Sequence, residues 1–187
     1  MNKRKRKERL DNDDNDDSST NLVYNVNNHI YFYASVNQHT VLKLNSLIKT
    51  LNISLLNTKN EYDLNNIFIY IHINSLGGEI YAALSSVDTI INSKIPIISI
   101  VEGCAASAAT LISIVCNERH MTKYSSILIH QLSSGFWGNF TEIKDDVKNL
   151  EYLENLTKKI YIKYSNKKIS DKYLNKILKH DILWGDI

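Results

Sequence analysis

Proline and cysteine are scarce in this sequence, with one proline and two cysteines in 187 residues. Cys104 and Cys116 both lie in apolar stretches and are too few for the disulfide framework that holds small secreted domains together. We therefore expect reduced thiols. The spacing of the two cysteines fits no common zinc motif, and we expect no metal.

Long apolar runs are also missing, and none reaches the length of a bilayer span, so we expect no membrane association. The N-terminus begins with basic residues but has no apolar segment after them, so it does not match the pattern of a secretory signal. The net charge of +2 is too close to neutral for a nucleic-acid-binding surface, and we expect no nucleic-acid partner. These absences make the cytoplasm the default location, with an organelle as the alternative.

Residues 1–22 form a polar tail in which six positive and six negative charges balance. Because this segment has almost no apolar area to bury, we expect it to be disordered. Its basic run at residues 3–7 leaves open a nuclear signal or a contact with an anionic partner, although a solvated tail is the simpler interpretation. The rest of the chain, residues 23–187, is predicted to be one domain, large enough to bury a core.

From residue 23 onward, strand and helix patterns alternate. Residues 23–36 are strand-like, residues 37–52 have apolar positions at helical spacing, and residues 67–73 form a continuous apolar run typical of a strand buried on both faces. This order makes a βαβ unit and predicts an α/β fold with a parallel sheet. The alternation continues with predicted helices at 80–92 and 107–116 and predicted strands at 97–101 and 126–130.

A long helix is predicted over residues 142–164, with Thr141 as its N-cap. Its apolar residues form a single stripe, which is typical of a helix that projects from a small domain and packs against a neighbour. A shorter helix is predicted at 170–178. Residues 133–138, before the long helix, are polar and contain glycine, so we expect an extended segment there.

Ser107 stands between a β-branched strand and an apolar helix, and flanking alanines let other backbone come close to its hydroxyl. Hydrolysis by a serine also needs an imidazole to take its proton, a carboxylate to orient the imidazole, and N–H donors for the oxyanion. His130 and Asp181 can supply the imidazole and the carboxylate. The pair Gly77-Gly78 permits positive φ and the close approach of N–H groups to a bound oxygen.

Each of these residues also has a plainer interpretation when it is taken alone. Ser107 could be a buried small residue at a tight helix start, and His130 a core histidine with satisfied hydrogen bonds. The glycine pair could form an ordinary turn between a strand and a helix. For the carboxylate, Asp171 and Asp186 lie near Asp181 in the sequence.

Several motifs together resemble those of one family, and the resemblance runs from about Ile30 to Asp181. The motif Y-I-N-S-P-G-G is similar to Tyr70-Ile-His-Ile-Asn-Ser-Leu-Gly-Gly78, and Y-D-T-M is similar to Val87-Asp-Thr-Ile90. The motif G-x-A-A-S is similar to Gly103-Cys-Ala-Ala-Ser107, and M-I-H-Q is similar to Ile129-His-Gln131. The motif E-R-D-x-F is similar to Lys179-His-Asp-Ile-Leu183. The chain thereby resembles the ClpP family of caseinolytic serine peptidases, the proteolytic subunits of the ATP-dependent Clp protease.

The resemblance implies a role for each residue that matches a family motif. Ser107 would be the nucleophile, His130 the general base and Asp181 its orienting carboxylate, so the implied activity is that of a serine endopeptidase. The backbone N–H groups of Gly78 and Ala108 would form the oxyanion hole. No metal or cofactor is implied, because ATP is used by the partner unfoldase and not by this chain. Substrate peptides would lie against an extended segment made of Ser133, Ser134, Gly135 and Phe136.

The family fold is a crotonase-like spiral of βαβ units with a protruding handle helix, which corresponds to residues 142–164. The resemblance implies a homo-oligomer of two stacked heptameric rings whose handle helices interlock and whose active sites face an enclosed chamber. An AAA+ unfoldase would feed unfolded protein substrates into that chamber.

Two other functions stay open. A catalytically silent or weakly active ring subunit with a scaffold or regulatory role is suggested by Leu76 and Leu132, which stand where the family has prolines. It is also suggested by the end of the given sequence six residues after Asp181. His180 stands where the family often has an arginine that pairs between rings, which leaves the formation of the double ring open. A crotonase-type acyl-CoA enzyme would share the scaffold and the oxyanion hole, but its chemistry does not need the serine, histidine and aspartate together.

Overall fold

The computed structural model describes residues 22–166, 169–180 and 183–185, so the predicted tail lies outside the described residues except for Leu22. The described chain folds around one mixed sheet with strand order β1-β2-β3-β4-β6-β7, and β5 lies beside β4. The pairs β1–β2 and β6–β7 are antiparallel, and the strands between them pair in parallel. The strands are β1 (Val23–Val26), β2 (His29–Phe32), β3 (Ile69–Ser75), β4 (Ile97–Ala106), β5 (Glu118–Met121), β6 (Ser126–Leu128) and β7 (Leu183–Gly185).

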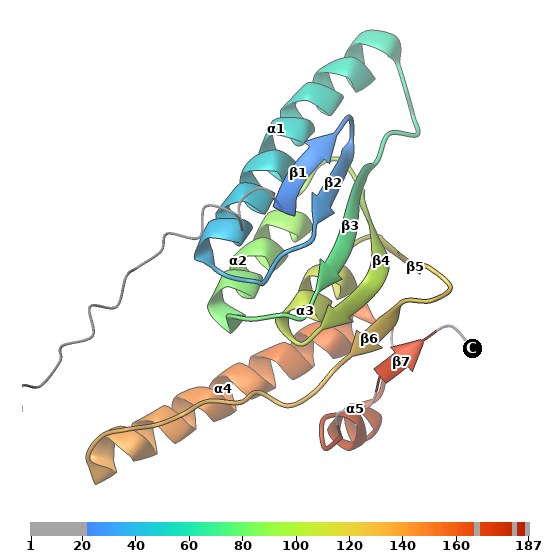
Figure 1. Ribbon diagram of the computed structural model, residues 1–187. Helices are drawn as coiled ribbons and strands as arrows, with labels where there is room; N and C mark the ends of the chain where they lie inside the picture. Colours follow the sequence, from blue (N-terminus) through green and yellow to red (C-terminus); the bar gives the residue numbers. More distant parts are fainter. Residues whose placement is uncertain (1–21, 167–168, 181–182, 186–187) are drawn as a thin grey trace, which may run out of the picture.

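Helices cover one face of this sheet and its lower end. Figure 1 shows α1, α2 and α3 packed on one face, while α4 passes below the strands and extends well beyond them. The α/β architecture that the alternating sequence pattern predicts is therefore confirmed. The helices are α1 (Gln38–Tyr62), α2 (Ile80–Ile91), α3 (Ala108–Ile114), α4 (Phe140–Tyr164) and α5 (Asp171–Ile177).

The main core lies between the sheet and α1, α2 and α3. On β3, Ile69, Ile71 and Ile73 are fully buried, and they alternate with side chains on the opposite face of the sheet. Fully burying one isoleucine contributes about 1.5–3 kcal/mol, so this row anchors the centre of the sheet. The strand predicted at residues 67–73 is confirmed as β3. The prediction that helices bury both of its faces is wrong, because α1, α2 and α3 cover one face of the sheet.

The region predicted as one strand, residues 23–36, contains a hairpin formed by β1 and β2. Its turn passes through Asn27, whose φ of 52° is a conformation that asparagine tolerates better than most residues. After β2 the chain reaches Val36, which forms an isolated parallel bridge with Gly78. The hairpin therefore places the start of the α1 segment beside the glycine turn.

α1 is longer than its prediction. The helical spacing predicted over residues 37–52 ends ten residues before the helix does, since α1 continues to Tyr62. Residues 53–62 contain neither glycine nor proline, and Leu55 and Leu56 pack against the core. The helix ends at Asp63, which adopts the left-handed conformation with φ 48° that commonly terminates helices.

α4 confirms the predicted long helix, although Asn139 and not Thr141 is its N-cap. The Asn139 side chain accepts hydrogen bonds from the first turn while Glu142 bonds back to the Asn139 N–H, a capping box of the kind that stabilises a helix by about 1 kcal/mol. The buried side chains lie in its C-terminal half and are Leu153, Thr157 and Tyr161. Exposed apolar side chains lie in its N-terminal half and include Phe140, Ile143 and Val147.

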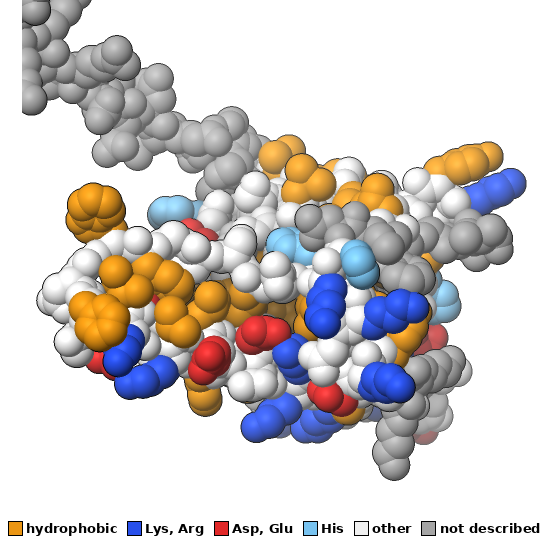
Figure 2. Space-filling view, turned by 90° about the horizontal axis from the view of Figure 1, so that it is seen from below, with side chains coloured by type: hydrophobic (Ala, Val, Ile, Leu, Met, Phe, Trp, Pro, Cys, Tyr) orange, Lys and Arg blue, Asp and Glu red, His pale blue; other side chains and the backbone are white. Residues whose placement is uncertain are grey.

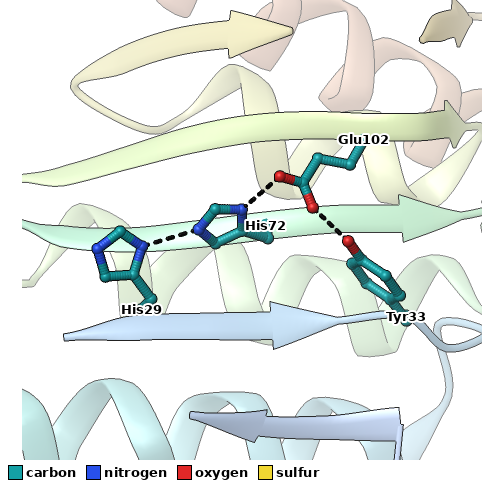
Figure 3. A network of polar contacts seen from close by, with 4 residues as sticks. All are labelled: His29, Tyr33, His72 and Glu102. Carbon is teal, nitrogen blue, oxygen red and sulfur yellow. Dashed lines mark hydrogen bonds and ion pairs between the residues drawn. The ribbon is translucent and has the colours of Figure 1, made fainter. Parts of the chain in front are cut away.

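The face of the sheet opposite α1, α2 and α3 carries a chain of hydrogen-bonded polar side chains (Figure 3). His29 Nδ1 lies 2.8 Å from His72 Nε2, and the other ring nitrogen of His72 lies 2.8 Å from Glu102. Tyr33 donates its hydroxyl proton to the second carboxylate oxygen of Glu102. Tyrosine rings stack on both imidazoles. The network links β2, β3 and β4 through their side chains.

The surroundings shift the pKa of three groups in this network. Burial and the neighbouring His72 lower the pKa of His29. Burial acts to raise the pKa of Glu102, but its hydrogen bonds with Tyr33 and His72 outweigh burial and leave that pKa lowered. Burial and the hydrogen bond to Glu102 raise the pKa of Tyr33 to about 12. At neutral pH the network therefore holds a neutral His29, an ionised Glu102 and a neutral Tyr33.

We expect the protein to lose stability as the pH falls, because the unfolded state binds more protons at both lowered groups. The free energy of unfolding should decrease below about pH 6.5 because of His29, and further near pH 4.5 because of Glu102. Urea unfolding at pH 7.5 and 5.5 measures the first decrease. His29→Gln should reduce it, whereas the exposed control His39→Gln should not. An equal pH dependence in wild type and His29→Gln would contradict this expectation.

Candidate functional site

Ser107 lies at the junction of a strand and a helix, as its neighbours in the sequence predict. β4 ends at Ala106 and α3 begins at Ala108, and Ser107 between them has φ 52° and ψ −126°. Positive φ in such a residue carries about 1–3 kcal/mol of strain, which persists only where the surrounding structure enforces it. The Ser107 N–H donates to the Leu128 carbonyl at 2.8 Å. The Ser107 carbonyl accepts from the Thr110 N–H at 3.0 Å and from the Thr110 hydroxyl at 2.6 Å.

The turn after β3 brings two glycines against Ser107. Gly77 and Gly78 have φ of 93° and 148°, which side-chain-bearing residues rarely adopt. A Cβ on Gly77 would lie 2.6 Å from the Ala106 carbonyl oxygen and 2.7 Å from the Ser107 Cβ. A Cβ on Gly78 would overlap the Val36 carbonyl oxygen. Only glycine at both positions lets the two segments meet this closely.

Two backbone N–H groups beside Ser107, those of Gly78 and Ala108, have no hydrogen-bond partner among the described residues. Val36 donates its N–H to the Gly77 carbonyl at 2.9 Å and accepts the Glu79 N–H at 2.8 Å, which leaves the intervening N–H of Gly78 free. Ala108 is the first residue of α3, so its N–H has no acceptor within the helix. Two such donors can stabilise the negative oxygen that develops when a carbonyl group is attacked.

Ser107 and His130 line one cleft of about 370 Å³. His130 follows the end of β6 by two residues and is half-buried. No hydrogen bond joins the two side chains in this structure, and such bonds often tighten only when substrate is bound. The cleft is also lined by Gly78 and by three of the residues expected to bind substrate, which are Ser133, Ser134 and Phe136.

The segment 133–138 runs between β6 and α4 as a mostly exposed stretch that belongs to no strand of the described chain. Gly135 lies in this segment but not in the lining of the cleft. The opposite wall comes from α4, including Leu150 and Leu153. The cleft is therefore lined by an extended segment and by a helix, and Ser107 is part of the same lining.

Asp181, the expected orienting carboxylate, lies outside the described residues. Its neighbours on both sides are described. His180 precedes it, and β7, which starts at Leu183, pairs antiparallel with β6 in a register that places Leu183 opposite Leu128. β6 is also the strand that leads to His130.

Thr110 and Tyr161 also contribute to the surroundings of Ser107, although neither belongs to a motif that indicates the site. Thr110 lies three residues after Ser107 in a predicted helix, so its contact with the Ser107 carbonyl could have been inferred from helical spacing. The Tyr161 hydroxyl lies 2.5 Å from the Thr110 hydroxyl but is 51 residues away in the chain. No signal in the sequence connects those two residues.

In the described part of the chain, no group of three histidine, cysteine, aspartate or glutamate side chains is arranged to hold a metal ion. The helices described here are also too short or too polar to cross a membrane. The free thiols are Cys104, which is half-buried, and Cys116, which is buried.

Comparison with known proteins gives consistent matches. Residues 17–182 match the family model described as Clp protease. The ATP-dependent Clp protease proteolytic subunit of Deinococcus radiodurans is 33% identical over 100 residues, which cover 52% of this chain and 49% of that protein. The match thus spans about half the length of this curated relative. A ClpP1 variant from Listeria monocytogenes has a similar structure, with a TM-score of 0.69 and 20% identity over 82% of this chain and 80% of that one. The fold is therefore the ClpP/crotonase-like fold.

Gly78→Ala should destabilise the protein by about 1–3 kcal/mol, because a methyl group there overlaps the Val36 carbonyl oxygen and the residue must keep a φ of 148°. Gly135→Ala is the matched control, since a Cβ at Gly135 meets nothing within 4 Å. Urea unfolding of both variants measures the difference. Equal stability of the two variants would mean that the glycine turn is not constrained as described.

Proposed function

Because this chain belongs to the Clp protease family, we propose that it is a serine endopeptidase that cleaves unfolded proteins and peptides inside a ring assembly. One observation carries the proposal: a strained serine at a strand-to-helix junction lies beside two N–H groups that have no partner in the described part of the chain, and it shares its cleft with a histidine. A serine that only filled space in the core would need neither the free donors nor the open cleft.

The proposed reaction has two halves, and in each half His130 first accepts a proton and then donates one. His130 takes the proton of the Ser107 hydroxyl as the oxygen attacks the scissile carbonyl carbon. The carbonyl oxygen becomes negative and accepts hydrogen bonds from the N–H groups of Gly78 and Ala108. His130 then gives the proton to the leaving amine, and an acyl-enzyme remains. In the second half, His130 takes a proton from water, the water oxygen attacks the acyl carbon, and Ser107 leaves with its proton restored.

We assign the orienting carboxylate to Asp181. Two described features support this choice. The residue lies two positions before β7, and β7 pairs with the strand that leads to His130. Asp171, one of the alternatives, occupies the first turn of α5, where its side chain accepts a hydrogen bond from Asn175. An ionised carboxylate beside the imidazole would hold the tautomer that accepts the serine proton.

We propose that substrates bind through their backbone along the segment from Ser133 to Phe136. This stretch is extended, and it belongs to no strand of the described sheet, so its own N–H and C=O groups can pair with a peptide. The apolar wall formed by Leu150 and Leu153 can accommodate different side chains. The proposed chemistry uses only side chains and N–H groups, so this chain should cleave small peptides without metal or nucleotide, and ATP would be used by a partner AAA+ unfoldase.

We further propose that the protein assembles into homo-oligomeric rings, heptameric and stacked in pairs, through the exposed part of α4. Figure 2 shows apolar side chains gathered over this helix on the lower side of the molecule. Phe140, Ile143 and Val147 are exposed there at helical spacing. An apolar stripe of this kind on a projecting helix is typical of a surface that packs against another subunit.

A fluorophosphonate probe should label the wild-type protein, and Ser107→Ala should abolish labelling and lower peptide hydrolysis roughly 10⁴- to 10⁶-fold. Asp181→Asn should lower hydrolysis by roughly 10⁴-fold, because the imidazole loses its orienting charge. The matched controls are Ser46→Ala, on the exposed side of α1, and Asp171→Asn. Both controls should keep the wild-type rate.

Absence of labelling in well-folded wild type would overturn the peptidase assignment and favour a catalytically silent ring subunit. Labelling that survives in Ser107→Ala would show that another residue is the nucleophile. If Asp171→Asn and not Asp181→Asn removed the activity, the carboxylate assignment would be wrong while the peptidase function stood.

Val147→Glu should weaken assembly, because it places a charge within the exposed apolar stripe of α4. Sedimentation velocity of the full chain should then show smaller species than the wild type at equal concentration. Tyr152→Glu makes a comparable change on the same helix, away from the stripe, and should leave the distribution unchanged. A monomeric wild type, or the same shift in both variants, would contradict the assembly through this stripe.

A further inference from the structure

A pair of buried hydroxyl groups connects α4 to the backbone of Ser107. The Thr110 hydroxyl donates its only proton to the Ser107 carbonyl at 2.6 Å. Its contact with the Tyr161 hydroxyl at 2.5 Å must therefore use the tyrosine proton. Burial raises the pKa of Tyr161 to about 12, so that proton is present throughout the neutral range. Tyr161 thus donates to Thr110, and Thr110 donates to Ser107.

The direction of the Ser107 carbonyl also decides the direction of the Ala108 N–H. Both groups belong to one planar trans peptide, in which the C=O and the N–H point in opposite directions. Whatever holds the carbonyl therefore aims the N–H. Gly78 shows the same construction, because its N–H belongs to the peptide whose Gly77 carbonyl is held by the Val36 N–H.

We propose that Tyr161 and Thr110 are positioning residues for the oxyanion hole, which orient the Ala108 N–H by holding the carbonyl of the same peptide. This inference rests on the proposed function. Neither residue touches the substrate carbonyl, and they act through the Ser107–Ala108 peptide.

Packing alone does not hold this contact in place. A cavity of about 310 Å³ borders both hydroxyl-bearing residues, with Met121 and Ile129 also in its lining. Because there is free volume beside Tyr161, the hydrogen bond has more influence on its position than it would in a close-packed core. A shift of α4 that withdrew the tyrosine hydroxyl would leave the Ser107 carbonyl with one less constraint.

The position of Tyr161 also links the site to assembly. Leu153, Thr157 and Tyr161 form the buried stripe in the C-terminal half of α4, while the exposed apolar stripe lies in the N-terminal half of the same helix. A helix transmits displacement along its axis as a rigid element. A displacement of α4 by the proposed subunit packing would therefore move the Tyr161 hydroxyl relative to Thr110.

Tyr161→Phe tests the proposal, because it removes one hydroxyl and keeps the ring. With a fluorogenic peptide and protein of equal assembly state by sedimentation, we expect kcat to fall about 10- to 100-fold while KM changes less than about twofold. The rate of fluorophosphonate labelling should fall by the same factor as kcat. The control is Tyr164→Phe on the same helix, whose hydroxyl makes no hydrogen bond within the described chain.

Variants of Thr110 separate positioning from a purely structural role. Thr110→Val keeps the shape without the hydroxyl and should lower kcat as Tyr161→Phe does. Thr110→Ser keeps the hydroxyl and should restore most of the rate. A lower melting temperature with an unchanged kcat in both Tyr161→Phe and Thr110→Val would overturn the proposal. It would mean that the hydrogen bond between Tyr161 and Thr110 stabilises the fold and does not position the oxyanion hole. Wild type that is not labelled at all would overturn the proposed function and this inference together, whereas labelled wild type with equally active variants would overturn this inference alone.

Discussion

The backbone of Ser107 is held at both of its polar atoms, and the rest of the site depends on that restraint. Its N–H bonds to β6 and its carbonyl to α3, so three elements meet at one residue. Each of these hydrogen bonds contributes about 1 kcal/mol to stability. Together they offset the strain of about 1–3 kcal/mol that a positive φ carries. The strain is useful because it turns the side chain out of the strand and leaves the next N–H without an acceptor.

Both proposed oxyanion donors are built in the same way. In each case a carbonyl is tied to a neighbouring segment, and planarity of the peptide then leaves the following N–H aimed into open space. For Gly78 the tie comes from Val36, at the start of the α1 segment. For Ala108 it comes from Thr110 within α3. The hole therefore requires that the β2–α1 connection, the glycine turn and the β4–α3 junction all be correctly packed.

α4 has two surfaces that serve different purposes. Its C-terminal half packs against the domain and reaches the Ser107 backbone through Tyr161. Its middle part, including Leu150 and Leu153, lines the cleft, and its N-terminal half exposes an apolar stripe. A helix shared by the site and by the proposed subunit contact gives a physical route by which assembly would affect the proposed catalysis. The hydrogen-bonded network of His29, Tyr33, His72 and Glu102 contributes no residue to the lining of this cleft, so we expect its pH response in the stability of the sheet.

Local patterns were sufficient to predict the alternating α/β order and the long α4 helix, because apolar periodicity is contained within a few neighbouring residues. Short motifs indicated Gly78, Ser107 and His130 one at a time, and only the folded chain places all three in the lining of one cleft. The same patterns missed the hairpin at Asn27, ended α1 ten residues early, and gave no sign of β5 or β7, whose three or four residues take strand form only through their partners. The contact of Tyr161 with Thr110 and that of His29 with His72 join residues 51 and 43 positions apart. Such contacts arise when packed elements bring distant side chains together, and no local pattern encodes that meeting.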